Sequence, residues 1–265
     1  MKLIASQDNA RFKALQRLAH SSRERKLLGL SLLDGIHLVA AYRATVGAPQ
    51  ELVLSESSSE DPEIRSLLAA GSTPVPVMLT DSLFKSLSTV ATPTGIMAVV
   101  PTPRPTPTYP VSETSLLLDS VQDPGNLGSV LRTAAAAGVR HVFLSPHTVH
   151  AWSPRVLRAG MGAHFLLNIY EQCDLNTVMR GFMGRVIAAS QRATRSLFDA
   201  DLAGPIALLL GNEGGGLSAS MEAQAQESIA IPMPGGTESL NVAAAAAICL
   251  YEYVRQNARK LEASQ

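Results

Sequence analysis

Residues 206–217 read Ile206-Ala-Leu-Leu-Leu-Gly-Asn-Glu-Gly-Gly-Gly-Leu217, an apolar run followed directly by a glycine-rich polar segment. Five consecutive apolar residues that end at such a segment predict a strand buried on both faces. The glycines that follow allow backbone amides to approach a ligand closely. In an open parallel sheet, ligands bind beyond the carboxyl ends of the strands, so this stretch predicts a buried strand and one wall of a binding site.

The same alternation continues on both sides of this stretch. Short apolar segments that predict strands alternate with amphipathic or alanine-rich segments that predict helices. This pattern is typical of a parallel, doubly wound sheet, so we predict an α/β fold. The predicted strands are 116–118, 141–144, 186–188, 206–210 and 229–231, and the predicted helices are 127–137, 153–161, 175–182, 218–224 and 242–261.

A proline-rich segment, Pro101-Thr-Pro-Arg-Pro-Thr-Pro-Thr-Tyr-Pro110, divides the chain. Its prolines exclude a helix and favour an extended, semi-rigid spacer. We therefore predict a first domain at 1–100, a linker at 101–112 and a second domain at 113–265. The first domain also alternates helices and strands but has no paired carboxylates, metal cluster or phosphate loop, so we interpret it as a smaller α/β binding module.

Composition excludes several classes of protein. Of the 265 residues, 46% are hydrophobic and 17% are charged, which excludes intrinsic disorder. Two cysteines can form neither a disulfide framework nor a four-cysteine zinc site, and we predict no metal. No segment has the length of a membrane span, and the start of the chain turns polar too early for a signal peptide, so we expect a soluble, cytoplasmic protein.

The net charge of zero conceals a basic N-terminal segment. Residues 1–45 carry eight basic and three acidic side chains, whereas residues 46–100 carry two basic and six acidic ones. A basic segment on a neutral protein indicates a local anionic partner, although a solvated helix face would have the same composition. The candidate contacts to an anionic partner are Lys13, Arg17, Arg23, Arg25 and Lys26.

Three polar segments lie where the predicted sheet would bind a ligand, at 119–128, 211–217 and 232–241. Each contains an asparagine that offers both donors and acceptors, and the nearest charges are Arg132 and Glu213. The alternative is that the glycines only form tight turns and the two charges form an ion pair. Three such segments, each after a strand of one predicted sheet, favour a ligand-binding site. The chain lacks a P-loop, and no GxGxxG follows a strand, which disfavours a nicotinamide dehydrogenase.

These segments resemble a known family. Asp123-Pro-Gly-Asn-Leu-Gly-Ser-Val-Leu-Arg-Thr-Ala134, then 210–218, then 231–234 with 239–244 are similar to the three motifs of the SpoU (TrmH-type) RNA ribose 2′-O-methyltransferases of the SPOUT superfamily. The N-terminal part resembles that family's L30e-like substrate-binding domain, with Asp34 where the family more often has Glu. The resemblance implies a parallel-sheet domain with a trefoil knot, S-adenosylmethionine as cofactor, and a homodimer formed through the C-terminal domain, for which the last helix offers Tyr251 and Tyr253.

The resemblance also implies roles for individual residues. Arg132 is the implied catalytic residue, and because arginine is effectively never deprotonated, we expect it to stabilise the developing alkoxide or hold a phosphate rather than act as a base. Asn126 would orient Arg132 or the ribose, Glu213 would pair with Arg132 or contact the cofactor, and Ser239 and Asn241 would complete the catalytic site. The implied cofactor-binding residues are Leu209, Gly211, Asn212, Gly214, Ile231, Met233, Ser239, Leu240 and Asn241.

The expected activity is therefore methylation of a ribose 2′-hydroxyl in RNA, with 23S-type ribosomal RNA favoured over transfer RNA. A tRNA ribose 2′-O-methyltransferase is one alternative. A non-catalytic RNA-binding or ribosome-assembly factor that kept the fold is another.

Overall fold

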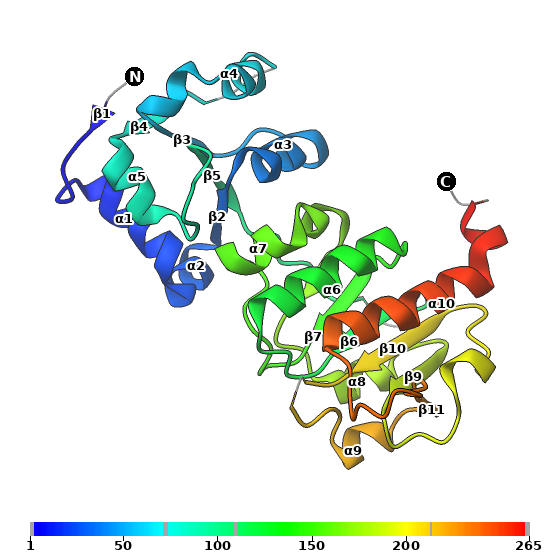
Figure 1. Cartoon of the computed structure of the whole chain (residues 1–265). Coiled ribbons are helices and arrows are strands. Elements are labelled where there is room, and N and C mark those ends of the chain that lie inside the picture. The colour runs from blue at the N-terminus through cyan, green and yellow to red at the C-terminus, as the bar shows by residue number, and fades with distance from the viewer. Residues whose placement is uncertain (1–2, 71–73, 109–110, 213, 263–265) are drawn as a thin grey trace. The chain divides into compact units, whose positions relative to one another are not determined.

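The computed structural model describes residues 3–70, 74–108, 111–212 and 214–262, with the side chains of 259–262 left out. The chain forms two compact units (Figure 1). Unit 1 consists of Met1–Pro103 and Trp152–Phe165, and unit 2 of Arg104–Ala151 and Leu166–Gln265. The division falls inside the predicted linker. It also assigns 152–165, which we predicted as part of the second domain, to the first unit.

Unit 1 is built on a five-stranded mixed sheet in the order β1-β4-β3-β5-β2. Strand β5 runs antiparallel to both of its neighbours, whereas β1, β4 and β3 are parallel. The strands are β1 (Leu3–Ile4), β2 (Leu30–Asp34), β3 (Glu51–Ser55), β4 (Val77–Leu79) and β5 (Ile96–Pro101). The helices are α1 (Ala10–His20), α2 (Ser22–Leu28), α3 (Ile36–Thr45), η1 (Ser57–Glu60), α4 (Pro62–Ala69), α5 (Asp81–Leu87), α7 (Pro154–Gly160) and η2 (Ala163–Leu166), whose last residue is assigned to unit 2.

Helix α7 joins unit 1 although the chain reaches it from unit 2. It packs against β2, and the ring of Phe165 meets the ring of Tyr42 in α3 edge-on, with centroids 5.3 Å apart. Trp152, Val156 and Leu157 are buried. The segment thus completes the apolar core of the first unit.

Unit 2 is built on a six-stranded, fully parallel sheet in the order β11-β9-β10-β6-β7-β8. The strands are β6 (Ser115–Leu118), β7 (His141–Leu144), β8 (Asn168–Tyr170), β9 (Arg185–Ala189), β10 (Ile206–Leu210) and β11 (Glu227–Ile229). The helices are α6 (Pro124–Ala136), α8 (Leu175–Arg180), η3 (Leu197–Asp199), α9 (Ala219–Glu222) and α10 (Val242–Glu262). The predicted α/β fold with a parallel sheet is confirmed, while the trefoil knot stays a prediction.

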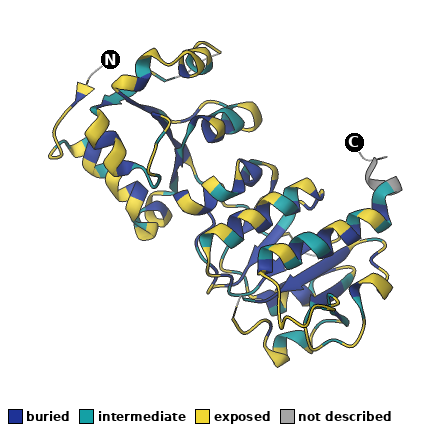
Figure 2. Ribbon diagram, viewed as in Figure 1, coloured by how far each residue is buried: buried dark blue, intermediate teal, exposed yellow. Residues whose placement is uncertain are grey.

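The sheet of unit 2 brings the polar segments to one edge. Strands β6 and β10 are buried along their whole length, as expected for strands covered on both faces (Figure 2). Leu210 pairs with Leu118, Leu209 with Ala188, and Ile229 with Ala189. The carboxyl ends of β6, β9, β10 and β11 therefore lie next to one another at the same edge of the sheet. Among the described residues, no helix combines the length and hydrophobicity needed to cross a membrane.

Candidate cofactor pocket and catalytic motifs

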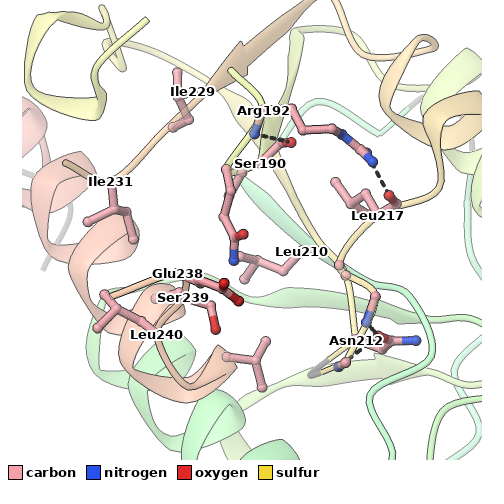
Figure 3. Close-up of a pocket in the computed structure, with 18 of the residues that line it drawn as sticks. Ser190, Arg192, Leu210, Asn212, Leu217, Ile229, Ile231, Glu238, Ser239 and Leu240 are labelled. Carbon is pink, nitrogen blue, oxygen red and sulfur yellow. Dashed lines mark hydrogen bonds between the residues drawn. The ribbon is translucent and has the colours of Figure 1, made fainter. Parts of the chain in front are cut away.

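A pocket of about 260 Å³ lies at the carboxyl ends of β9, β10 and β11. Its walls come from the segments that follow these strands and from the first turn of α10, and Figure 3 shows Asn212 on one side with Glu238 and Ser239 on another. Apolar side chains alternate with glycines and a few polar groups along the walls. The lining residues are 189–192, 210–212, 214–217, 229, 231, 233, 238–240, 242 and 245.

The glycine-rich segment after β10 folds back on itself. Asn212 and Gly216 exchange two backbone hydrogen bonds of 3.3 and 3.2 Å, which close the loop. The Oδ1 of Asn212 accepts from the amides of Gly214 and Gly215, at 3.0 and 2.6 Å. A Cβ on Gly211 would lie 2.1 Å from the carbonyl carbon of Gly216, so a side chain cannot be accommodated there. Within the loop, backbone hydrogen bonds and one asparagine side chain therefore maintain its shape.

The segment before α10 supplies the opposite wall. Ile231, Met233, Ser239 and Leu240 line the pocket together with Glu238, whose carboxylate is exposed. Asn241, the next residue, caps α10 instead: its Oδ1 accepts from the amides of Ala243 and Ala244, at 2.9 and 3.4 Å. Such a cap satisfies backbone donors that the first turn of a helix leaves unpaired.

An amide–amide hydrogen bond joins the first and third polar segments. Asn241 donates through Nδ2 to the Oδ1 of Asn126 at 2.8 Å, and Asp123 accepts from the amide of Asn126 at 2.7 Å while capping α6. Since α6 and α10 pack on each other, this bond fixes how their N-terminal ends meet. Two predicted site residues that are 115 positions apart are therefore brought together.

Comparison with protein families matches residues 113–251 to the SpoU rRNA methylase family. The chain belongs to this family. The "Uncharacterized tRNA/rRNA methyltransferase slr1673" of Synechocystis is 35% identical over 96% of this chain and 93% of its own length. The 23S rRNA (guanosine(2553)-2′-O)-methyltransferase RlmP of Bacillus subtilis is 30% identical over 95% of this chain and 98% of its own length.

Solved structures with the same architecture cover nearly the whole chain. The crystal structure of an RNA 2′-O ribose methyltransferase superposes with a TM-score of 0.83 at 30% identity, over 97% of this chain and 100% of that one. The SpoU methyltransferase AviRb of Streptomyces viridochromogenes, in complex with the cofactor AdoMet, gives a TM-score of 0.83 at 27% identity, over 94% and 98% of the two chains. The predicted family, and with it the predicted enzyme class of RNA ribose 2′-O-methyltransferases, is confirmed.

In this SpoU chain the pocket contains most of the residues that we predicted to bind the cofactor. Leu209 is an exception, since its side chain packs in the apolar core of unit 2 and is fully buried. Asn241 is another, because it lies beside the pocket and caps α10. Glu213 lies outside the described residues. The predicted residues that line the pocket are Gly211, Asn212, Gly214, Ile231, Met233, Ser239 and Leu240.

Arg132 does not line the pocket. It lies on α6, six residues after Asn126, with its side chain exposed to solvent. Its guanidinium makes no hydrogen bond or ion pair within the described part of the chain. Asn126 and Asn241 are therefore brought together as predicted. Of the two roles expected for Asn126, no hydrogen bond to Arg132 is seen among the described residues, and orientation of the ribose stays a prediction.

Sequence reasoning missed the pocket wall that follows β9. Ser190, Gln191 and Arg192 line the pocket, and so does Glu238. The available signal was that residues 190–192 lie just beyond the predicted apolar strand 186–188. The rule that ligands bind beyond the carboxyl ends of parallel strands applies to that strand as well.

Arg25 is a wrong prediction among the candidate RNA contacts. Its side chain is 5% exposed and donates to the carbonyls of Leu18 and Ala19, at 2.6 and 3.1 Å. It thereby satisfies carbonyls that the end of α1 leaves unpaired, and burial lowers its pKa. Lys13, Arg17, Arg23 and Lys26 are exposed, as an RNA contact requires, with Lys13 paired to Asp8 at 2.8 Å.

The last helix offers less apolar surface than the sequence indicated. Tyr253 is buried, and its hydroxyl accepts a 2.9 Å hydrogen bond from Thr114 within the same unit. Tyr251 is 52% exposed. Of the two tyrosines that we expected at a dimer contact, only Tyr251 is accessible.

Proposed function

We propose that this chain transfers the methyl group of S-adenosylmethionine to a ribose 2′-hydroxyl of ribosomal RNA. The observation that carries the proposal is the pocket, which the second and third motifs of the SpoU family build at the carboxyl ends of the parallel strands. Its support comes from relatives of nearly the same length that are named 23S rRNA 2′-O-methyltransferases, and from AviRb, which binds AdoMet on the same fold.

The residues of the pocket suit the cofactor chemically. Leu210, Ile231 and Leu240 give apolar surfaces against which an adenine ring can pack. The glycine-rich loop adds backbone that carries no bulky side chains, and Glu238 adds a negative charge for a ligand that is a sulfonium cation. When bound, the cofactor supplies a methyl group activated for displacement by its positive sulfur.

The contribution of the chain to the reaction is alignment and charge. The 2′-hydroxyl oxygen must be held in line with the methyl carbon and the sulfur, and the hydroxyl proton must pass to an acceptor, which is the neighbouring phosphate or water. The guanidinium of Arg132 stabilises the alkoxide as it forms or holds the neighbouring phosphate, because it offers a positive charge and a fixed set of hydrogen-bond donors. Asn126 and Asn241 fix the N-terminal ends of α6 and α10, and so position the segment that carries Ser239 and Leu240. The hydroxyl of Ser239 and the carboxylate of Glu213 complete the proposed site.

RNA recognition is assigned to unit 1, which the resemblance to an L30e-like domain and the exposed Lys13, Arg17, Arg23 and Lys26 support. We further propose a homodimer formed through unit 2, to which the exposed Tyr251 of α10 contributes, and a cytoplasmic site of action. Both stay predictions from the family.

Mapping ribose methylation tests the proposal directly. In RNA from cells that lack this protein, one 2′-O-methyl group is expected to disappear from large-subunit ribosomal RNA and to return with the wild-type chain but not with Arg132→Ala. Purified protein with labelled S-adenosylmethionine is then offered 23S rRNA and, in parallel, tRNA. Methylation of tRNA but not of 23S rRNA would show that the substrate is tRNA and not ribosomal RNA. If neither RNA is methylated and the cells lose no 2′-O-methyl group, the proposed activity is refuted.

A further inference from the structure

We propose that Arg192 is a positioning residue that, together with Glu222, holds the glycine-rich loop 211–217 in the shape that forms the cofactor pocket. The inference rests on the proposed function, because it assigns to these two residues control over the affinity for S-adenosylmethionine. Neither residue belongs to one of the three motifs of the family.

Arg192 bridges two walls of the pocket. It follows β9, where its amide donates to the hydroxyl of Ser190 at 3.2 Å. Its Nη2 donates to the carbonyl of Leu217 at 2.7 Å, and Figure 3 shows the guanidinium extending toward that carbonyl. Ser190, Arg192 and Leu217 all line the pocket. The side chain therefore ties the end of the loop to the segment after β9.

Glu222 holds the other side of the guanidinium. It lies at the end of α9, which begins immediately after the loop, and its Oε2 accepts from the Nε of Arg192 at 3.1 Å. Burial acts to raise the pKa of Glu222, but hydrogen bonds from Arg192, Ser190 and Ser228, together with the positive charge of Arg192, outweigh it and lower the pKa. The carboxylate thus stays ionised at neutral pH and keeps Arg192 in place.

A loop with four glycines needs such an anchor. Glycine loses more backbone entropy on ordering than any other residue, and Gly211, Gly214, Gly215 and Gly216 all belong to this loop. Inside the loop, Asn212 supplies the side-chain hydrogen bonds. Arg192 adds the link to the sheet. Without Arg192, the pocket-forming shape becomes one of several loop conformations. The apparent association constant is then the intrinsic one multiplied by the fraction of molecules that keep this shape.

A matched ion pair on the same sheet provides the control. Arg195 pairs with Glu227 and donates through Nη2 to the carbonyl of Asp199 at 3.0 Å. Like Arg192, it is a partly exposed arginine bound to one carboxylate and one carbonyl, with 46% against 57% of the side chain exposed. Arg195 does not line the pocket. A general effect of losing an arginine ion pair would therefore be the same in both variants.

The test measures binding of S-adenosylmethionine to the full chain by isothermal titration, together with single-turnover methylation of RNA. We expect Arg192→Ala to weaken binding about tenfold, the size of losing a charge-assisted hydrogen bond at a partly exposed site. Arg192→Lys should recover part of the affinity, since one ammonium cannot reproduce the forked contact. Arg195→Ala should bind like the wild type. At saturating cofactor, the rate for Arg192→Ala should equal the wild-type rate, because positioning acts on binding and not on transfer.

Four results decide between explanations. Equal affinity in Arg192→Ala and Arg195→Ala refutes the anchor, and so does a rate that stays low at saturating cofactor. If Arg192→Ala does not fold, Glu222→Gln, which keeps the shape of the side chain and removes its charge, must weaken binding, or the proposal is wrong. A wild-type chain that binds no S-adenosylmethionine contradicts the proposed function instead, which separates the two failures.

Discussion

Replacing Gly211 by alanine is the sharpest perturbation of the pocket that the structure offers. Gly211 directly follows β10 and is buried beneath the closed loop. The added Cβ would lie 2.1 Å from the carbonyl carbon and 2.3 Å from the carbonyl oxygen of Gly216, and 2.4 Å from the amide nitrogen of Leu217. All three neighbours are backbone atoms, so no side-chain rotation can relieve the overlap.

The size of the effect follows from that geometry. Contacts of a Cβ closer than 3.0 Å are essentially never observed, so the Gly216–Leu217 peptide must move away by about 0.9 Å. This movement breaks or stretches the two backbone hydrogen bonds between Asn212 and Gly216, each contributing about 1 kcal/mol. With overpacking at about 1–3 kcal/mol, the total is about 3–5 kcal/mol against the pocket-forming loop. At 1.4 kcal/mol per factor of ten, we expect affinity for S-adenosylmethionine to fall by about a hundredfold or more.

Titration calorimetry on the full chain checks this prediction, with circular dichroism to show that the variant is folded. Gly235→Ala is the control, because a Cβ there meets nothing within 4 Å and its backbone is not left-handed. We expect the control to bind like the wild type. A Gly211→Ala protein that is folded and binds S-adenosylmethionine within a few-fold of the wild type would show that the loop does not shape the pocket as argued.

Three further predictions concern catalysis, RNA and stability. Arg132→Ala should lower single-turnover methylation about a hundredfold with unchanged cofactor affinity, and a loss restricted to cofactor binding would contradict its role at the alkoxide. Replacing Arg23 and Lys26 by alanine should reduce the salt slope of RNA binding by about 0.7–0.9 per lost phosphate contact, whereas Arg25→Ala should leave it unchanged and destabilise unit 1 by about 2 kcal/mol in urea titrations. A fragment of residues 104–265 should still bind S-adenosylmethionine but bind more of a hydrophobic dye than the full chain, because it carries α7 without the sheet that buries it.

The strands whose bounds the sequence predicted correctly are those that form from a local run of apolar residues. β7 and β10 have the predicted bounds, because each is a short apolar run flanked by polar residues. β2 was missed. Its five residues, Leu30-Ser-Leu-Leu-Asp34, become a strand by pairing with β5, about 66 residues later, which no local pattern reveals. The last predicted strand, 229–231, is shifted, since β11 ends at Ile229, where its pairing with β9 ends.

Charge patterns proved less informative than glycine patterns. Arg23, Arg25 and Lys26 are equivalent in a count of charges, yet Arg25 alone turns inward to cap α1. Whether a cation faces solvent depends on the angle between α1 and α2, which is a property of packing. The glycines of the loop, by contrast, are required by close backbone approach, and that requirement is visible in the residue type itself.

The two asparagines of the first and third motifs show why a motif predicts a place more securely than a role. Sequence reasoning placed Asn126 and Asn241 at one site, and the structure joins them by a hydrogen bond. Yet the Oδ1 of Asn241 is used to cap α10, and its Nδ2 is used to reach Asn126. The polar atoms that would make Asn241 a substrate ligand are thus engaged in holding two helix ends together. If replacing Asn241 abolishes activity, there are two explanations. The substitution either displaces the neighbouring pocket residues Ser239 and Leu240 or removes a contact to the ribose. A change in cofactor affinity distinguishes the two explanations, because only the displaced pocket wall alters it.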